Sequence, residues 1–342
     1  MSRLVRSHLV ERAPADRLVE VVREVCGIHA QVMGSAELQL ADRIDGITQA
    51  DVREALWERR ELVKTWTLRG TLHLHPADEL GLWTAARRAV PGEADRVAAG
   101  LENVDEVVAA IGEALRGRRL TREELADAVA ERVGPGPREQ LTSGWGYYLG
   151  DAATAEQLCF GPPQGQRVTF VHPDDWLGRS AAWEPEEALR EVARRYAATY
   201  GPVTHREFRK WFGSRERSFE DLDFPQPDET VATTQSVRLL PEYDVYVMGY
   251  RDREAFVPPA VREQIKAHGK GRYEGPAGTP FLLVDGVCAG IWRRRKTAKR
   301  IELDVEPARK LTRAERDGVE AEAQRIGAFL ALEPRLEIAV AS

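Results

Sequence analysis

The sequence predicts an α+β protein with tandem winged-helix units followed by a small antiparallel β-barrel or sheet. Three observations predict this fold. Signals for helix starts recur along the chain, and the first two lead through a helix into two strand-like runs joined by a turn. The last third of the chain changes to runs of β-branched and aromatic residues. A length of 342 residues suits several compact units better than one small domain.

The recurring helix start is a threonine followed three residues later by an acidic residue. In such a capping box the threonine hydroxyl accepts a backbone N–H, and the acid reaches back to the cap. Apolar residues at helical spacing predict further helices over 15–25, 36–44, 103–117 and 138–149, and Pro76 is placed to open another. The capping pattern occurs at Thr48 to Asp51, Thr121 to Glu124 and Thr204 to Glu207.

Strand pairs after these helix starts set the predicted boundaries. The first pair is 62–68 and 71–74 around Gly70, and the second is 157–160 and 167–170. The third is weaker, with Val231 and 237–240 as its candidates. We therefore expect winged-helix units at 1–92, 93–182 and 183–240, and a β-barrel-like region with a C-terminal helix at 241–342.

The C-terminal region predicts its own elements. Asp285-Gly286 suits the type I′ turn of a hairpin over 281–292. Residues 301–305 alternate apolar and polar side chains, so one face of this strand should be buried. A long helix over 312–332 and a last strand at 336–338 complete the prediction.

Charge and composition limit the class of protein. The net charge of −6 argues against a protein that simply coats nucleic acid. Basic residues nevertheless gather at 205–210, 266–272 and 293–300, which favours a phosphate-binding face. No apolar run has the length of a membrane span, and the first residues do not form a signal peptide. We expect a cytoplasmic protein.

Metal and disulfide chemistry are not expected. Cys26, Cys159 and Cys288 are far apart and suggest no disulfide framework. Cys26-x-x-His29 is half of a zinc pattern that no second pair completes, and His73-x-His75 supplies only two ligands. The sequence also lacks the GxSxG, HExxH and Walker A motifs. We expect neither a metal nor a cofactor.

His29 and Gln31 are the candidate catalytic residues. They lie in a short polar break between the helical runs 15–25 and 36–44. Two residues apart, their side chains can point the same way in extended backbone. By pattern alone, a histidine and a glutamine at a helix junction are more typical of capping than of catalysis.

The segments 27–31, 65–74 and 239–253, together with shorter ones, match a known family in order and over nearly the whole chain. They resemble the AlkZ/YcaQ-like winged-helix DNA glycosylases. The resemblance implies tandem winged helices with a β-barrel element, C-shaped around a DNA channel. It also implies a catalytic pair of the form Gln-x-Gln or Gln-x-Asp, in which Gln31 matches the second position and His29 replaces the usual first Gln. Tyr243, Asp244, Tyr246 and Asp252 match the family without an assigned role. The matching segments are 27–31, 38–43, 65–74, 239–253, 283–287 and 290–293.

The activity implied is monofunctional hydrolysis of the N-glycosidic bond of N7-alkylated guanine, including bulky adducts and crosslinks, in base-excision repair or self-resistance. Such a base already carries a positive charge and departs neutral, so a strong general acid is not needed. Gln31 would orient the attacking water, and His29 would activate or position it. No lysine is near enough in the sequence to suggest a lyase step.

The expected partner is double-stranded DNA bearing alkylated purines, bound by a monomer. One alternative is a winged-helix DNA-binding regulator without catalysis. A second is a protein–protein scaffold, which the net charge allows but the clustered arginines do not predict. The candidate DNA contacts are Arg69, Thr71, His73, Arg206, Lys210, Arg293, Arg294, Arg295 and Lys296.

Overall fold

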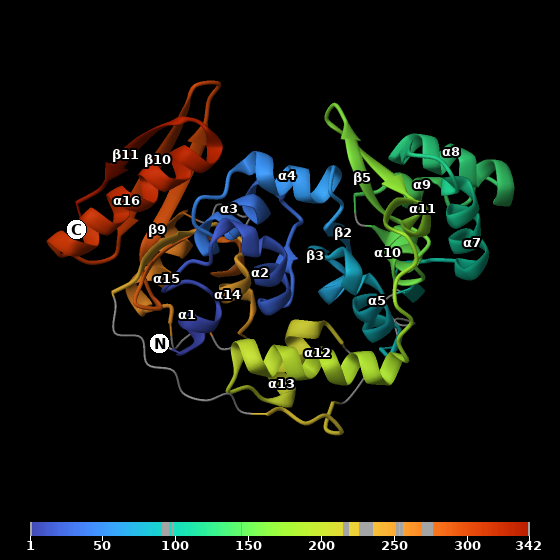
Figure 1. The fold of residues 1–342 in the computed structure, drawn as a ribbon, viewed down its shortest axis with the longest axis horizontal. Coiled ribbons are helices and arrows are strands. Elements are labelled where there is room, and N and C mark those ends of the chain that lie inside the picture. The colour runs from blue at the N-terminus through green and yellow to red at the C-terminus, as the bar shows by residue number, and fades with distance from the viewer. Residues whose placement is uncertain are drawn as a thin grey trace. The chain divides into compact units, whose positions relative to one another are not determined.

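The chain divides into two compact units, drawn as a ribbon in Figure 1. Unit 1 comprises Met1–Arg53, Tyr196–Val203 and Pro225–Ser342, and unit 2 comprises Glu54–Arg195 and Thr204–Phe224. The division into three winged-helix units and a C-terminal β-barrel-like region stays a prediction. The computed structural model describes residues 2–90, 96–97, 99–144, 146–214, 219–225, 235–250, 253, 256–268 and 276–340.

Helices in the N-terminal part of unit 1 agree with the apolar spacing of the sequence. The predicted helix at 15–25 is a 3₁₀ turn followed by α2, and the run at 36–44 lies in α3, which begins three residues earlier. Thr48 and Asp51 hydrogen-bond each other's backbone N–H at the start of α4, as predicted. These elements are α1 (Ser2–Arg6), η1 (Ala15–Arg17), α2 (Leu18–Glu24), β1 (Ile28–His29), α3 (Met33–Arg43) and α4 (Gln49–Trp57).

A five-stranded sheet dominates the C-terminal part of unit 1, in the order β11-β10-β9-β8-β7. The order has two ends, so the described strands form an open sheet. The helices of this part are α14 (Val245–Met248), α15 (Pro259–His268) and α16 (Arg313–Leu330), with η4 (Pro276–Gly278). The strands are β7 (Val237–Leu240), β8 (Phe281–Val284), β9 (Val287–Lys296), β10 (Arg300–Pro307) and β11 (Glu333–Ile338).

Two details of this sheet differ from the prediction. The run 237–240, predicted in the hairpin of a third winged helix, is β7 and pairs with β8, with Val237 opposite Val284, and the other candidate for that hairpin, Val231, lies outside the described residues. The sheet is also not wholly antiparallel. β11 runs parallel to β10, since α16 carries the chain back across the sheet before β11 begins.

The predicted hairpin and the strand after it are confirmed. Asp285 and Gly286 have φ angles of 48° and 83°, the left-handed pair that a type I′ turn requires. In β10, Ile301, Leu303 and Val305 are buried and alternate with more exposed residues. The packing of this sheet therefore follows from local turn chemistry and a period of two.

Unit 2 begins with a hairpin and a helix. The strands β2 and β3 pair as predicted, with Thr65 opposite His73, and the helix follows Pro76. Both strands are buried along all five residues, so neither behaves as an exposed wing. These elements are β2 (Leu62–Trp66), η2 (Leu68–Gly70), β3 (Leu72–Pro76), η3 (Ala77–Glu79) and α5 (Leu80–Arg88).

The rest of unit 2 combines helices with a three-stranded sheet in the order β4-β6-β5. Capping boxes at Thr121 and Thr204 are confirmed by reciprocal hydrogen bonds with Glu124 and Glu207. The elements are α7 (Val104–Leu115), β4 (Leu120–Thr121), α8 (Arg122–Val133), α9 (Arg138–Thr142), α10 (Tyr147–Thr154), β5 (Cys159–Gln164), β6 (Arg167–Val171), α11 (Pro173–Leu177), α12 (Pro185–Tyr200) and α13 (His205–Phe212).

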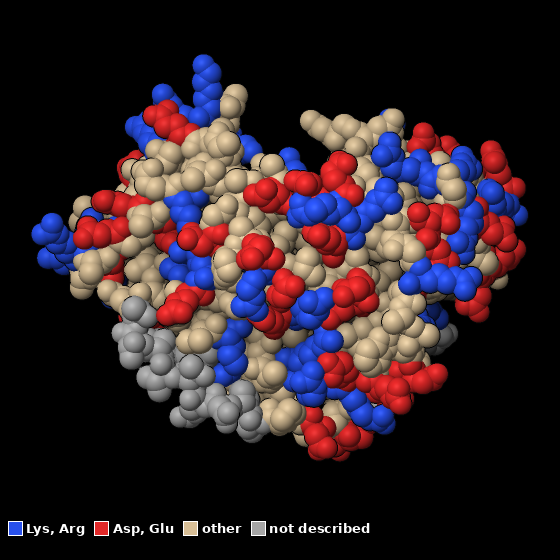
Figure 2. Space-filling model, viewed as in Figure 1, with Lys and Arg blue, Asp and Glu red and all other residues tan. Residues whose placement is uncertain are grey.

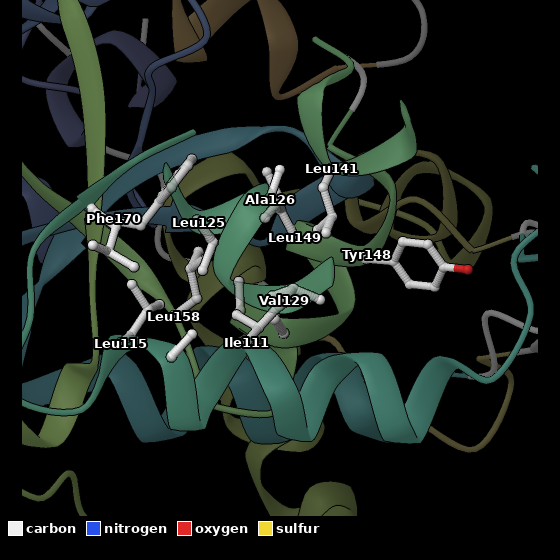
Figure 3. Packing of buried hydrophobic residues seen from close by; sticks show 14 of the residues in the cluster. Ile111, Leu115, Leu125, Ala126, Val129, Leu141, Tyr148, Leu149, Leu158 and Phe170 are labelled. Carbon is white, nitrogen blue, oxygen red and sulfur yellow. The ribbon is translucent and has the colours of Figure 1, made fainter. Parts of the chain in front are cut away.

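The single helix predicted at 138–149 is wrong, because α9 ends at Thr142 and α10 begins at Tyr147. Gly146 has a φ of 88°, which other residues rarely adopt, and a Cβ there would lie 2.7 Å from Trp66 Nε1. The break lets α10 pack into the core of unit 2. Figure 3 shows this core, in which Ile111, Leu125 and Leu149 from three helices meet Phe170 of β6.

His75 of β3 gives the stability of the chain a pH dependence. Its ring is buried and stacks on Trp83 with centroids 4.2 Å apart. Burial, with the charge of Arg195, lowers the pKa of His75 to about 3. Because an unfolded histidine titrates near 6.5, the unfolded chain binds more protons between these two values, and the free energy of unfolding falls as the pH is lowered.

We expect His75 to contribute a loss of about 1.4 kcal/mol per pH unit below pH 6. Urea titrations of the full chain at a series of pH values measure it. His75→Gln keeps a polar group near Thr67, whose hydroxyl lies 2.9 Å from Nε2, and removes the titration. Equal pH slopes for the variant and the wild type would show that another group is responsible.

Within the part of the chain that the structure describes, no helix is long and apolar enough to cross a membrane.

Candidate active site

The predicted catalytic pair lies between a tight turn and the start of α3. Cys26 and Gly27 have φ angles of 62° and 89°, and the Gly27 N–H donates to Val22 O at 2.8 Å, which ends α2 and reverses the chain. β1 then carries His29, and Gln31 follows in a bend two residues before Met33 begins α3. The order helix, turn, short strand and helix therefore places both residues at one junction in unit 1.

The two side chains of the pair differ in burial. His29 is 4% exposed, whereas Gln31 is exposed to solvent. Val32 beside Gln31 is 39% exposed, although it is apolar. The backbone of His29 is fixed, because its carbonyl accepts the Gln39 side-chain amide at 3.1 Å. The motif thus combines a held, largely buried imidazole with an amide that reaches water.

Tyr243 forms part of the surroundings of His29. The two rings have centroids 5.2 Å apart and planes inclined by 34°. Tyr243 is half-buried and has a φ of 60°, in the left-handed region. Its N–H donates to Ala277 O at 2.7 Å. A residue more than two hundred positions away in the chain therefore supplies one side of the histidine.

Hydrogen bonds join α3 to the segment 242–245 that carries Tyr243. The hydroxyl of Ser35 donates to Glu242 O, and the N–H of Val245 donates to Gln39 Oε1 at 3.2 Å. Gln39 is buried and uses both ends of its amide, one for His29 and one for Val245. The amide thus links β1 to this distant segment.

A buried ion pair supports the same junction. Arg43 donates to both carboxylate oxygens of Asp244, at 2.7 and 2.8 Å, and both side chains are fully buried. Arg43 also donates to Gln39 O at 2.9 Å, and Asp244 accepts the Tyr246 N–H at 2.8 Å. Burial acts to lower the pKa of Arg43, but Asp244 outweighs it and the pKa is raised. Arg43 stays charged.

Arg294, a predicted DNA contact, is paired within unit 1. It donates to both carboxylate oxygens of Glu242 at 2.8 Å, and its guanidinium lies 5.7 Å from the centroid of the Trp292 ring. Its side chain is 21% exposed. Because Glu242 directly precedes Tyr243, the pair with Arg294 helps to hold the segment that contacts His29. The contact of Arg294 with DNA stays a prediction. To bind a phosphate, Arg294 would have to leave Glu242 or contact both groups at once.

The other arginines of the 293–300 run are also largely compensated by acidic residues of β10 and β11. Arg293 lies 3.5 Å from Glu306, and Arg295 pairs with Glu302. Lys296 ends β9 and is exposed. Figure 2 shows acidic side chains interspersed with Lys and Arg over the face drawn. The run is more nearly neutral than its sequence suggests, and its phosphate contacts stay a prediction.

Predicted contacts in unit 2 fall into two groups. His73 is only 1% exposed and its Nδ1 lies 3.1 Å from Thr71 O, so its ring packs inside unit 2 and its contact with DNA stays a prediction. Arg69 donates to Trp211 O at 2.5 Å, and the Thr71 hydroxyl donates to Leu68 O. The first contact ties the turn η2 to α13, and the second closes the turn itself.

α13 presents its basic residues on an open face. Arg206 and Lys210 are exposed, whereas Phe208, Trp211 and Phe212 are buried. This division gives one apolar and one basic side to a helix of eight residues. Among the predicted contacts of unit 2, these two retain an arrangement suited to phosphate binding.

The residues of the two half-patterns of a metal site are buried. Among the described residues, no group of three or more His, Cys, Asp or Glu side chains is arranged to hold a metal ion. Cys26 is buried and lies 3.9 Å from the hydroxyl of Thr199. His73 and His75 stack with centroids 5.9 Å apart and belong to the interior of unit 2.

The sequence predicts the candidate residues His29 and Gln31 but not the buried residues that hold them in place. Gln39 and Arg43 fall in a predicted helix and in a family-matching segment, but the sequence assigned no role to either, nor to Asp244. One signal was available, because an arginine on the buried stripe of a helix needs an acidic partner. Asp252, the remaining family residue without a role, lies outside the described residues.

Comparison with known proteins defines the class of the molecule as an enzyme acting on the N-glycosyl bonds of DNA. The sequence profile of the AlkZ-like DNA glycosylases matches residues 22–222 and 214–329. The chain belongs to the AlkZ-like DNA glycosylase family. This confirms the resemblance identified in the sequence.

Two matches from Streptomyces sahachiroi, one in sequence and one in structure, illustrate the similarity. One, named as an interstrand DNA cross-link repair glycosylase, is 29% identical, and the match covers 80% of this chain and 81% of the relative. The other is the solved structure of the DNA glycosylase AlkZ. It superposes with a TM-score of 0.81 at 27% identity and covers 99% of this chain and 97% of that chain.

Proposed function

We propose that the protein hydrolyses the N-glycosidic bond of N7-alkylated guanine in duplex DNA, including bulky adducts and interstrand crosslinks. The observation that carries this proposal is the exposed Gln31, two residues after a held His29, at the start of α3 in a DNA glycosylase. The name of the cross-link repair relative supports the inclusion of crosslinks. Such an activity would serve base-excision repair or self-resistance to DNA-alkylating compounds.

In the proposed reaction, water adds to C1′ of the deoxyribose while the bond from C1′ to N9 breaks. The electron pair of the broken C1′–N9 bond passes to N9, and the alkylated guanine leaves as a neutral base because it began with a positive charge. The Gln31 amide oxygen accepts a hydrogen bond from the water and faces the developing sugar cation. The proton of the water passes to His29 or, with His29 only positioning the water, to solvent.

The reaction stops at the abasic site. The proposed pair has no amine to form a Schiff base with C1′, so strand cleavage requires a separate chemical step. The exposed basic face of α13, with Arg206 and Lys210, is proposed to bind phosphates. Arg293, Arg295 and Lys296 are proposed as weaker contacts because acidic partners offset the two arginines.

The test is release of base from duplexes that carry either N7-methylguanine or a bulky N7-guanine adduct. We expect release of both bases and intact strands until the product is treated with hot alkali. Release of the bulky adduct alone would restrict the proposal to self-resistance. Tight duplex binding without release of either base would contradict it and support the DNA-binding regulator.

The His29→Gln variant separates the two roles of the histidine. It restores the Gln-x-Gln pair usual in the family and replaces a titrating group with one that does not titrate. If His29 accepts the proton, the wild-type rate falls on acidification and the variant rate does not. If His29 only positions the water, both enzymes keep the same pH profile and similar rates.

A further inference from the structure

We propose that Tyr243 is a positioning residue, which fixes the His29 imidazole for reaction. This inference rests on the proposed function of the His29 and Gln31 pair. It begins from the packing of the two rings, whose centroids are 5.2 Å apart in an inclined arrangement. A ring held against one side of an imidazole limits rotation of the imidazole about its Cβ–Cγ bond, and so determines where its nitrogens point.

The backbone of Tyr243 shows that this placement is imposed by its surroundings. A φ of 60° is uncommon for a bulky aromatic residue, and such a conformation persists only where neighbouring contacts fix it. Those contacts are present on both sides of Tyr243. Its own N–H donates to Ala277 O, Ser35 donates to Glu242 O, and the Arg43 pair holds Asp244.

The same contacts connect Tyr243 to the backbone of His29. Gln39 donates to His29 O at 3.1 Å and accepts from Val245 N–H at 3.2 Å. One buried amide therefore sets the distance between β1 and the segment 242–245. Backbone and ring of His29 are positioned by the same distant segment, through Gln39 for the backbone and through Tyr243 for the ring.

The burial of Tyr243 distinguishes this role from that of a core aromatic. Tyr246 and Tyr250, which follow this segment, are buried, and burial raises the pKa of both phenols. Tyr243 is half-buried, so it covers His29 with part of its surface and leaves part in solvent. A residue there shapes the site without being needed to fill the core.

The test compares Tyr243→Asn with Tyr243→Phe. Asparagine tolerates a left-handed φ and removes the ring, whereas phenylalanine keeps the ring and removes the hydroxyl. We expect the single-turnover rate of base release to fall about tenfold or more in the Asn variant, as for a small misplacement of a catalytic group. The Phe variant should stay within about threefold of wild type. Affinity for duplex DNA should not change in either variant. Tyr147→Asn, at a half-buried tyrosine of unit 2, is the matched control and should leave the rate unchanged.

A double-mutant cycle tests the route of the effect. If Tyr243 acts through the imidazole, its replacement by Asn should cost little in a His29→Gln background. An equal loss in both backgrounds would overturn the inference, because Tyr243 would then act independently of His29. A wild-type rate in the Asn variant would overturn it as well.

A measurement without substrate separates this inference from the proposed function. The His29 ring resonances in an NMR spectrum are those missing from His29→Gln. They should shift in Tyr243→Asn, where the neighbouring ring current is lost, and stay close to wild type in Tyr243→Phe. Unshifted resonances in the Asn variant would overturn the inference. Inactivity of the wild type, with the resonances shifted, would overturn the proposed function instead and with it any role of the packed rings in the reaction.

Discussion

Replacing Gln31 by alanine should lower the single-turnover rate of base release about 100- to 1000-fold, the effect of removing one well-placed polar group from a transition state. Gln31 is exposed in a bend before α3, so its loss should not disturb the core. Affinity for duplex DNA should stay within about twofold. Rapid-quench release from an N7-alkylguanine duplex measures the rate, and fluorescence anisotropy measures the affinity.

Gln324→Ala is the matched control for this substitution. Gln324 is an exposed glutamine of α16 in the same unit, and its replacement should leave the rate unchanged. A Gln31→Ala rate within about threefold of wild type would remove Gln31 from the reaction. A comparable loss in both variants would point to a general effect of the substitution instead of a chemical role for the amide.

The largest effect on stability is expected from Arg43→Met. The substitution leaves the Asp244 carboxylate buried without its partner, which costs about 3–5 kcal/mol of the free energy of unfolding. Urea denaturation of the full chain measures this loss. Because Arg43 belongs to the helix that Gln31 precedes, base release should fall as well.

Two further variants test the cause of this loss. Arg43→Met combined with Asp244→Leu removes both charges and should recover much of the stability. Arg295→Met removes an arginine whose side chain is 77% exposed in its pair with Glu302, and should cost less than about 1 kcal/mol. Losses of equal size for Arg43→Met and Arg295→Met would show that burial does not govern the contribution of these pairs.

Features encoded over a few residues could be predicted from the sequence. The capping boxes of α8 and α13 depend on residues three positions apart, and the turn at Asp285 depends on two adjacent residues. The burial pattern of β10 follows from its alternation. The position of His29 and Gln31 between two helices was also predicted, because the apolar stripes on either side are long enough to identify.

Features that depend on distant partners could not be predicted. β7 completes a sheet with a strand more than forty residues later, and no local pattern distinguishes this pairing from a hairpin. β3 was predicted as one strand of a winged-helix hairpin, but the burial of both its faces was not, because an alternating pattern does not reveal it. The residues that support the site could not be predicted for the same reason, since nothing near Arg43 in the sequence indicates Asp244 as its partner.

The 201 residues that separate Arg43 from Asp244 also bear on when the enzyme acquires activity during its synthesis. At about 5–20 residues per second, the ribosome adds Asp244 roughly 10–40 s after Arg43. Until then, β1 and α3 have neither Tyr243 nor the acidic partner of Arg43. An incomplete chain that carries the His29 and Gln31 motif therefore lacks an assembled site. Truncated products that stop before residue 240 should not release bases from DNA, even where part of the chain folds or binds DNA.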